Sequence, residues 1–258
     1  MESNQKEQEL IIGLHSVAEA LQNGRRHHRE LIATSESLAT LKKLLNSQSI
    51  NMPELPIKVA TAHHLQDMAR QLMESDGYKF KRIPSNLILV TSPTPIKSPT
   101  DIFVALDEQK ERAVKIVVLD RVTDAHNAAA IMRTMAFYGA DFLVTTIKGS
   151  FGLTPTFSRI SSGALEHVAF VQCSSLPRFL SKLRSKDISI IGFAEEGEYA
   201  AQLQWSGGSC CLVLGSEDLG LSHAVRRILP KMVSLHSKGG INSLNVSVAS
   251  AIAMERFF

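Results

Sequence analysis

The sequence predicts an α/β protein with two parts, a small N-terminal α/β domain and a larger C-terminal domain built on a mainly parallel sheet. Three observations support this. From residue 113 onward, apolar strand-like stretches alternate with helical ones, the pattern of a parallel sheet with helices on both faces. The stretch Val114–Leu119 (VKIVVL) has the composition of a strand covered on both faces. Three prolines within Ser92–Thr100 predict a stiff, extended linker between the two parts.

The N-terminal domain is predicted to begin with a helix over residues 10–24. Its apolar residues Leu14, Val17 and Leu21 fall on one face, and Gly24 ends it. Shorter elements follow at Glu30–Ala33, Ser37–Asn46, Ile57–Ala60, His63–Glu74 and Asn86–Thr91. We assign residues 1–92 to this domain and residues 93–112 to the linker.

The C-terminal domain, residues 113–258, is predicted to contain six strands and the helices between them. The strands are expected at Val114–Leu119, Asp141–Thr145, Val168–Val171, Ile188–Phe193, Cys210–Leu214 and Met232–Leu235. The helices are expected at Asn127–Tyr138, Pro155–Leu165, Leu176–Ser185, Ser222–Leu229 and from about Ser243 to the end.

Charge alone does not predict a nucleic-acid partner, because the net charge is only +3 over 258 residues. Two local basic clusters are exceptions, one around Arg25 and Arg26 and one around Lys81 and Arg82. Such runs are as often solvated turns as phosphate contacts. As phosphate contacts, these four side chains would bind a nucleic acid through the N-terminal domain.

Other features favour a globular protein of a reducing compartment, and we expect a cytoplasmic location. Cys173, Cys210 and Cys211 lack metal-ligand spacing and are expected to be reduced thiols. The first ten residues are polar and do not resemble a signal peptide. No apolar run approaches the roughly 20 residues of a membrane helix. The histidines show no paired spacing either, so no metal site is expected.

Polar residues that could carry chemistry follow three of the predicted strands. Asn127 and Arg133 lie six residues apart on the helix after Val114–Leu119. Ligands of open α/β sheets bind beyond the carboxyl ends of the strands, so both residues are well placed. Taken singly, Asn127 is better explained as a helix cap and Arg133 as one member of a surface ion pair.

The second and third polar segments lie near the end of the chain. Leu214 and Gly215 end an apolar strand and lead to Glu217 and Gly220, where the glycines allow close approach of the backbone to a ligand. The turn Ser243-Leu244-Asn245 opens the last helix, which is rich in Ser, Ala and Val. The mouth of that helix offers polar groups and unpaired backbone N–H groups to a ligand. No GxxxxGK[ST] or GxGxxG motif is present, which disfavours a nucleotide-dependent oxidoreductase.

In order and separation, these three segments resemble the three motifs of the SpoU/TrmH class of SPOUT RNA 2′-O-ribose methyltransferases. The likeness covers residues 114–258 and includes Ser161–Val168 (SSGALEHV) between the first two motifs. The N-terminal part, with IIGLHSVAEAL, resembles more loosely the L30e-like RNA-binding domain of the RlmB branch, whose members methylate a guanosine ribose of large-subunit ribosomal RNA.

The resemblance implies properties that the pattern alone does not give. It implies a deep trefoil knot near the C-terminus and a homodimer packed partly through the last helix. S-adenosylmethionine would be held by backbone groups at the five positions Leu214, Gly215, Gly220, Leu235 and Leu244. Arg133 would face the ribose hydroxyl, with Asn127, Glu217, Ser243 and Asn245 completing the catalytic set.

The chain departs from the family at two positions. Alanine stands at Ala129 where glycine is common, and His236-Ser237 stands where proline and methionine are common. Either change could reshape the cofactor pocket. A tRNA ribose methyltransferase and a non-catalytic RNA-binding or ribosome-assembly protein remain alternatives, although the intact catalytic set disfavours the latter.

Overall fold

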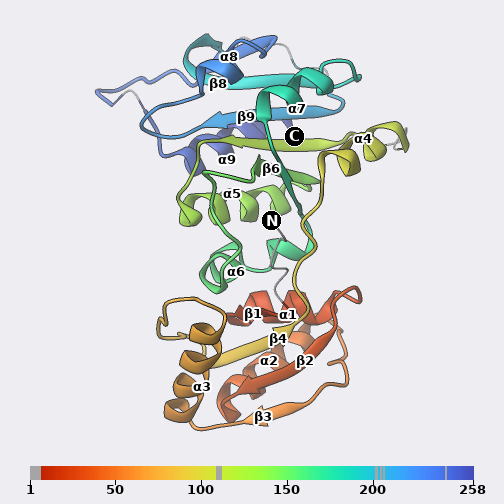
Figure 1. Ribbon diagram of the computed structural model, residues 1–258, viewed down its shortest axis with the longest axis vertical. Helices are drawn as coiled ribbons and strands as arrows, with labels where there is room; N and C mark the ends of the chain where they lie inside the picture. The colour runs from red at the N-terminus through yellow and green to blue at the C-terminus, as the bar shows by residue number, and fades with distance from the viewer. Residues whose placement is uncertain (1–6, 109–111, 201–202, 204, 206, 242) are drawn as a thin grey trace. The chain divides into compact units, whose positions relative to one another are not determined.

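The structure is a computed structural model that describes residues 7–108, 112–200, 203, 205, 207–241 and 243–258. The first residues of the expected N-terminal domain (1–6), part of the expected linker (109–111) and Asn242 of the last motif lie outside the described residues. The chain forms two compact units (Figure 1). Unit 1 comprises Met1–Pro95 and Leu153–Glu166, and unit 2 comprises Ile96–Gly152 and His167–Phe258.

Unit 1 is built on a four-stranded mixed sheet in the order β1-β4-β2-β3. Side chains of successive strand residues point to opposite faces, so each face carries its own core. Ile11, Leu31 and Leu89 pack with α1 and α2 on one face, whereas Ile12, Ile32 and Ile88 pack with α3 on the other. The elements are β1 Glu9–Ile12, α1 Leu14–Gln22, β2 His28–Ala33, α2 Ser35–Ser47, β3 Ile57–Val59, α3 Ala62–Ser75, β4 Leu87–Thr91, α6 Pro155–Ser161 and the 3-10 turn η1 Ala164–Glu166.

Unit 2 confirms the predicted parallel sheet. Its six strands lie in the order β10-β8-β9-β5-β6-β7, and every neighbouring pair is parallel. One face is covered by α4, α7 and α8, while α9 packs on α5 and β9. The elements are α4 Pro99–Glu108, β5 Lys115–Asp120, α5 Ala125–Phe137, β6 Phe142–Thr146, β7 Ala169–Cys173, α7 Leu176–Leu183, β8 Ser189–Tyr199, β9 Cys210–Gly215, α8 His223–Arg226, β10 Lys231–Ser234 and α9 Val246–Phe257.

Four predicted elements were wrong in extent, one of them the helix expected over Ser222–Leu229, which is the four-residue α8. Residues 10–12 form the end of β1 rather than the start of a helix, because Gly13 has a φ of 98° and breaks the chain direction there. The helix expected to continue to Leu165 stops at Ser161, since Ser162 and Gly163 adopt φ values of 51° and 89°. The strand expected to end at Phe193 continues to Tyr199.

The two units also divide the chain differently from the predicted domain ranges. The proline-containing segment expected as a linker includes α4, whose residue Ile102 is fully buried in the core of unit 2. Leu153–Glu166, from the middle of the predicted C-terminal domain, belongs to unit 1. There the hydroxyl of buried Ser16 donates to the carbonyl oxygen of Ser158 at 2.7 Å. The sequence pattern cannot reveal that Leu153–Glu166 joins unit 1, because this depends on contacts between distant segments of the chain.

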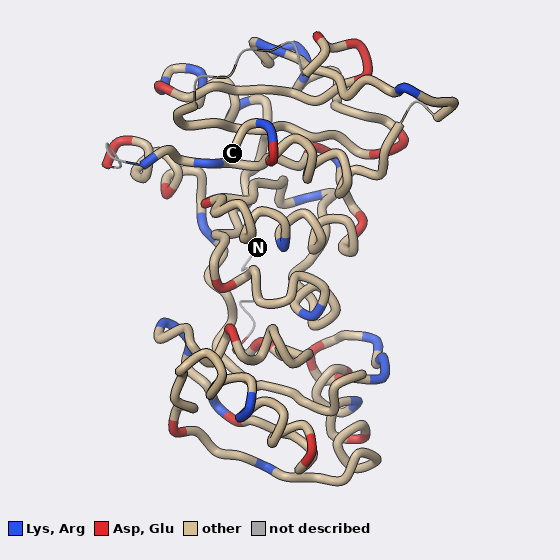
Figure 2. Tube along the Cα trace, turned by 180° about the vertical axis from the view of Figure 1, so that it is seen from behind, with Lys and Arg blue, Asp and Glu red and all other residues tan. Residues whose placement is uncertain are grey.

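None of the helices in the described residues combines the length and apolar character that crossing a membrane requires. From the side drawn in Figure 2, basic and acidic positions are interspersed along the chain, in keeping with the small net charge of +3.

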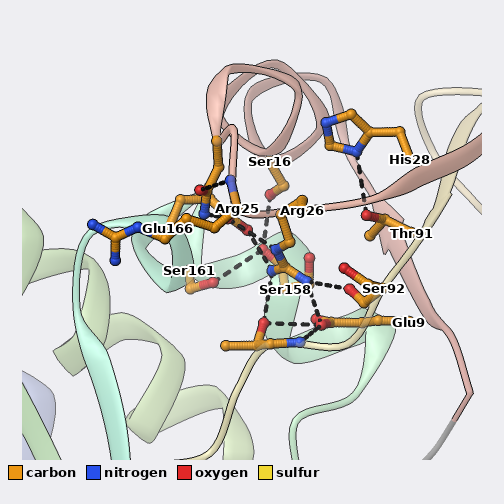
Figure 3. Close-up of polar contacts among 12 residues, drawn as sticks. Glu9, Ser16, Arg25, Arg26, His28, Thr91, Ser92, Ser158, Ser161 and Glu166 are labelled. Carbon is orange, nitrogen blue, oxygen red and sulfur yellow. Dashed lines mark hydrogen bonds and ion pairs between the residues drawn. The ribbon is translucent and has the colours of Figure 1, made fainter. Parts of the chain in front are cut away.

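Arg26 is a buried structural residue and not the exposed phosphate contact that the sequence suggested. Its side chain is only 2% exposed, and its guanidinium pairs with Glu9 at 2.7 Å and with Glu166 at 2.5 Å (Figure 3). The side chain uses all five of its N–H donors. Besides the two ion-pair contacts, it donates to the second oxygen of Glu166, to the carbonyl oxygen of Ser92 and to the hydroxyl of Thr94. The prediction of Arg26 as an RNA-binding residue is therefore wrong.

The electrostatics of this cluster explain why a charge can be buried here. Burial acts to lower the pKa of Arg26, but the hydrogen bonds and charges of Glu166 and Glu9 outweigh it and raise the pKa. The pKa of the neighbouring His28 is lowered by burial and by the charge of Arg26. Since Glu166 comes from the inserted segment, the ion pairs fasten that segment to β1 and to the chain just before β2.

We predict that Arg26→Ala destabilises unit 1 by about 3–5 kcal/mol, because it leaves two carboxylates largely buried and unpaired. Arg25→Ala, at the exposed neighbouring position, should change stability by less than about 0.5 kcal/mol. Hydrogen–deuterium exchange of peptides from β1, β2 and β4 measures unit 1 separately from unit 2. Equal protection in the two variants would contradict the structural role of Arg26.

Candidate active site

A cavity of about 700 Å³ lies in unit 2 at the carboxyl ends of three neighbouring strands. It is lined by residues at or just after the ends of β8, β9 and β10 and by one face of α9. This is the edge at which parallel sheets bind ligands. All five positions predicted to surround a cofactor line it, namely Leu214, Gly215, Gly220, Leu235 and Leu244.

The loop after β9 is held in a fixed shape beside this cavity. A side chain on Gly215 would overlap the backbone of Gly220 and Leu221, so only glycine fits there. Gly220 has a φ of 57°, and its N–H donates to the carbonyl of Ser216 at 2.8 Å. The loop therefore folds tightly back on itself and presents backbone groups to the cavity.

The end of β5 fastens the same loop from the other side. The carboxylate of Asp120, which is 5% exposed, accepts the backbone N–H of Ser222 at 2.6 Å. The guanidinium of Arg121 donates to the carbonyl oxygens of Leu219 and Gly220, each at 3.1 Å. Neither Asp120 nor Arg121 was predicted as a site residue. Their position directly after a predicted apolar strand was the available signal.

Three of the predicted catalytic residues form one hydrogen-bonded cluster. Glu217 Oε1 accepts the side-chain amide of Asn127 at 3.0 Å, the side-chain amide of Asn245 at 2.5 Å and the backbone N–H of Val246 at 3.1 Å. Asn245 also donates to Asn127 Oδ1 at 3.0 Å. The cluster thus joins α5, the loop after β9 and the start of α9, which are the three motif segments.

The caps of the two helices clarify what each asparagine does. Asp124, and not Asn127, is the N-cap of α5, so the Asn127 amide is available for Glu217. Asn245 is the N-cap of α9, where its oxygen accepts the N–H of Ser247 at 2.9 Å. Through its contacts with Asn245 and Val246, Glu217 holds the start of α9.

The two remaining predicted catalytic residues lie apart from this cluster. Ser243 is exposed and lines the cavity. Arg133 is exposed on α5, and no hydrogen bond or ion pair joins it to Glu217 or to either asparagine within the part of the chain that the structure describes. Six residues along an α-helix correspond to about 600° of rotation, so Asn127 and Arg133 leave the helix in different directions.

Sequence reasoning missed several cavity residues of the strand ends and of α8. Tyr199 ends β8, and Arg226 on α8 pairs with Glu196 at 2.5 Å. Both side chains line the cavity. Tyr199 was missed because β8 was predicted to end six residues too early.

Among the described residues, no group of three or more His, Cys, Asp or Glu side chains could hold a metal ion. Cys173, Cys210 and Cys211 are all buried and unpaired. Burial raises the pKa of Cys210 to about 12 and that of Cys211 well above its ordinary value, so neither is a thiolate nucleophile at neutral pH.

Comparison with known proteins identifies the class of this α/β fold and its cavity. The SpoU rRNA Methylase family matches residues 115–255, which span the whole sheet and all three motif segments. The chain belongs to this family and is an RNA 2′-O-ribose methyltransferase, so the resemblance stated from the sequence is confirmed.

Individual relatives extend the similarity to the N-terminal part. The chain is 28% identical over 248 residues to the 23S rRNA (guanosine-2′-O-)-methyltransferase RlmB of Pseudomonas putida, covering 95% of this chain and 94% of that protein. It is 26% identical over 250 residues to the RlmB of Escherichia coli, covering 95% and 96%. The SpoU methyltransferase AviRb of Streptomyces viridochromogenes, solved with AdoMet, has the same fold with a TM-score of 0.72 at 20% identity, covering 97% of this chain and 89% of that one.

We predict that Gly215→Ala displaces the loop after β9, because the added methyl group overlaps backbone atoms that cannot move independently. The expected loss of stability is about 1–3 kcal/mol. Trp205, which packs edge-on against Phe257, provides a fluorescence signal for unfolding of unit 2. Gly152→Ala is the control, since a methyl group there meets open space. Equal stability of the two variants would show that the loop is not fixed by this contact.

Proposed function

We propose that the protein transfers a methyl group from S-adenosylmethionine to the 2′-hydroxyl of a guanosine in large-subunit ribosomal RNA. The observation that carries this proposal is the single cluster in which Asn127, Glu217 and Asn245 unite the three motif segments beside the cavity. The RlmB relatives, similar over nearly the full length, support the ribosomal substrate. A transfer-RNA substrate is the alternative that the same chemistry permits.

The cavity suits this donor in size and in chemistry. Small-molecule sites commonly enclose about 300–1,000 Å³, and this cavity has about 700 Å³. The close approach at Gly215 leaves backbone groups of the loop facing the cavity. The backbone at Leu214, Gly215, Gly220, Leu235 and Leu244 would hold the donor, which supplies an electrophilic methyl group on a sulfonium.

The residues of the chain must make a weakly acidic ribose hydroxyl reactive. Arg133 is effectively always protonated, so we assign it electrostatic stabilisation of the developing alkoxide rather than proton abstraction. The proton of the hydroxyl would pass to a phosphate oxygen of the RNA as the ribose oxygen takes the methyl group, and the donor would leave as S-adenosylhomocysteine. Glu217 holds Asn127 and Asn245 in place, and this rigid cluster orients the ribose, since positioning contributes a large part of such catalysis.

A homodimer would complete the site, as the family resemblance implies. Arg133 is exposed on α5, four residues before Phe137, which is 82% exposed. On α9, which packs on α5, Val248 and Ile252 are 48% and 44% exposed. Covering these apolar side chains in a dimer would also remove Arg133 from bulk water. Away from water, the charge of Arg133 acts more strongly on the substrate.

Unit 1 is proposed as the L30e-like RNA-binding domain. Arg25, Lys81 and Arg82 are exposed and remain candidates for phosphate contacts. We also infer the trefoil knot of the family, supported by the sheet order in which β10 lies beside β8 and the last helix returns to α5 and β9. Three unpaired thiols support a cytoplasmic location.

We predict that Arg133→Ala abolishes methyl transfer but leaves donor binding measurable. Ribosomal and transfer RNA from a deletion strain serve as substrates, and mapping of ribose methylation identifies the modified nucleotide. Arg133→Lys should also be severely impaired, because the planar fork of donors is lost. Arg184→Ala, at an exposed position on unit 2, is the matched control. Near-normal turnover of Arg133→Ala would refute the assignment, and methylation of transfer RNA alone would refute the ribosomal substrate.

We further predict that combined charge reversal of Arg25, Lys81 and Arg82 raises KM for RNA and flattens its dependence on salt, since fewer counterions are released. The control reverses exposed Lys182 and Arg184 of unit 2. Arg26 is excluded because its reversal would unfold the buried cluster. An unchanged KM and salt slope would leave the three residues as ordinary surface.

A further inference from the structure

An aromatic pair lies at the cavity and has no part in the mechanism above. Tyr199 is the last residue of β8, and His236 follows the end of β10 by two residues. The two strands are parallel neighbours with Tyr199 opposite Ser234, so both rings emerge at the same edge of the sheet. Their ring centroids are 5.5 Å apart and their planes are inclined by 59°.

Both residues line the cavity. Tyr199 is half-buried and His236 is exposed, so the pair is not part of a core cluster. Phe193 and Phe257 line the cavity as well and contact each other edge-on with centroids 6.0 Å apart. The cavity therefore combines an aromatic wall with the polar turn at Glu217.

We propose that Tyr199 and His236 form the surface on which the purine ring of the methyl donor stacks. This inference rests on the proposed function and assigns its donor-binding residues more closely. Aromatic side chains bind flat heterocycles by stacking on them, because every nucleobase has a π-face on which a ring can stack. The other end of the donor, with its reacting methyl group, then belongs near Glu217 and Ser243, which line the same cavity.

A sulfonium bound over the rings is the competing role for this pair, since cations also seat on aromatic faces. Lys238 follows His236 by two residues and lines the cavity too, and a second cation beside it is disfavoured. Of the carboxylates near the end of β8, Glu196 is paired with Arg226 and Glu198 with Lys231, whereas Glu195 lines the cavity. The two roles differ in the affinity that they predict for a ligand without the sulfonium.

The test measures the binding of three ligands by calorimetry: S-adenosylmethionine, S-adenosylhomocysteine, which lacks the sulfonium, and 5′-methylthioadenosine, which keeps the purine but lacks the amino acid. Tyr199→Leu and His236→Ala should each weaken all three ligands roughly tenfold, the factor expected from losing one stacking partner. Tyr199→Phe, which keeps the ring, should bind like the unaltered protein. The control His64→Ala removes an exposed histidine of unit 1.

In turnover, KM for the donor should rise by the same factor, while KM for RNA stays the same. Unaltered affinity of Tyr199→Leu and His236→Ala would overturn the stacking role, and methyl transfer by the unaltered protein would then still support the proposed function. Weakening confined to S-adenosylmethionine would overturn it in favour of a sulfonium contact. If the unaltered protein binds none of the three ligands, the stacking role and the proposed function fail together.

Discussion

The catalytic half of this protein depends on one carboxylate that receives three donors. Glu217 Oε1 accepts both asparagine amides of the site and the first backbone N–H of the last helix. Because the two asparagines lie 118 residues apart along the chain, the carboxylate fixes the start of α9 against α5 and the loop after β9. Glu217 and Val246 both line the cavity, so this carboxylate joins two parts of its wall.

A buried charge has a comparable role in unit 1. Arg26 joins Glu9 of β1 to Glu166, which lies on a segment inserted from the second half of the chain. The chain therefore passes between the two units three times, at residues 95–96, 152–153 and 166–167. Unit 1 is thus completed by residues that the sequence motifs assign to the methyltransferase.

How well the sequence predicted a residue's surroundings depends on how far apart along the chain its contacts lie. Gly215 and Gly220 could be predicted because a short turn with close backbone approach leaves a local signal. The meeting of Asn127, Glu217 and Asn245 required the family resemblance, since each residue alone is equally suited to a cap or a turn. Arg26 was misassigned because the sequence does not distinguish it from Arg25, whereas in the structure Arg26 pairs with the carboxylates of Glu9 and Glu166.

The sequence by itself determined the class of fold and the family, because hydrophobic periodicity and the order of the three motifs are properties of the chain alone. It determined the strands of the parallel sheet to within a few residues, except for β8. Only the tertiary structure decided which polar groups are buried, how Leu153–Glu166 joins unit 1 and that Tyr199 meets His236 at the cavity. These features arise from contacts between distant segments, and burial and pairing exist only after the chain has folded.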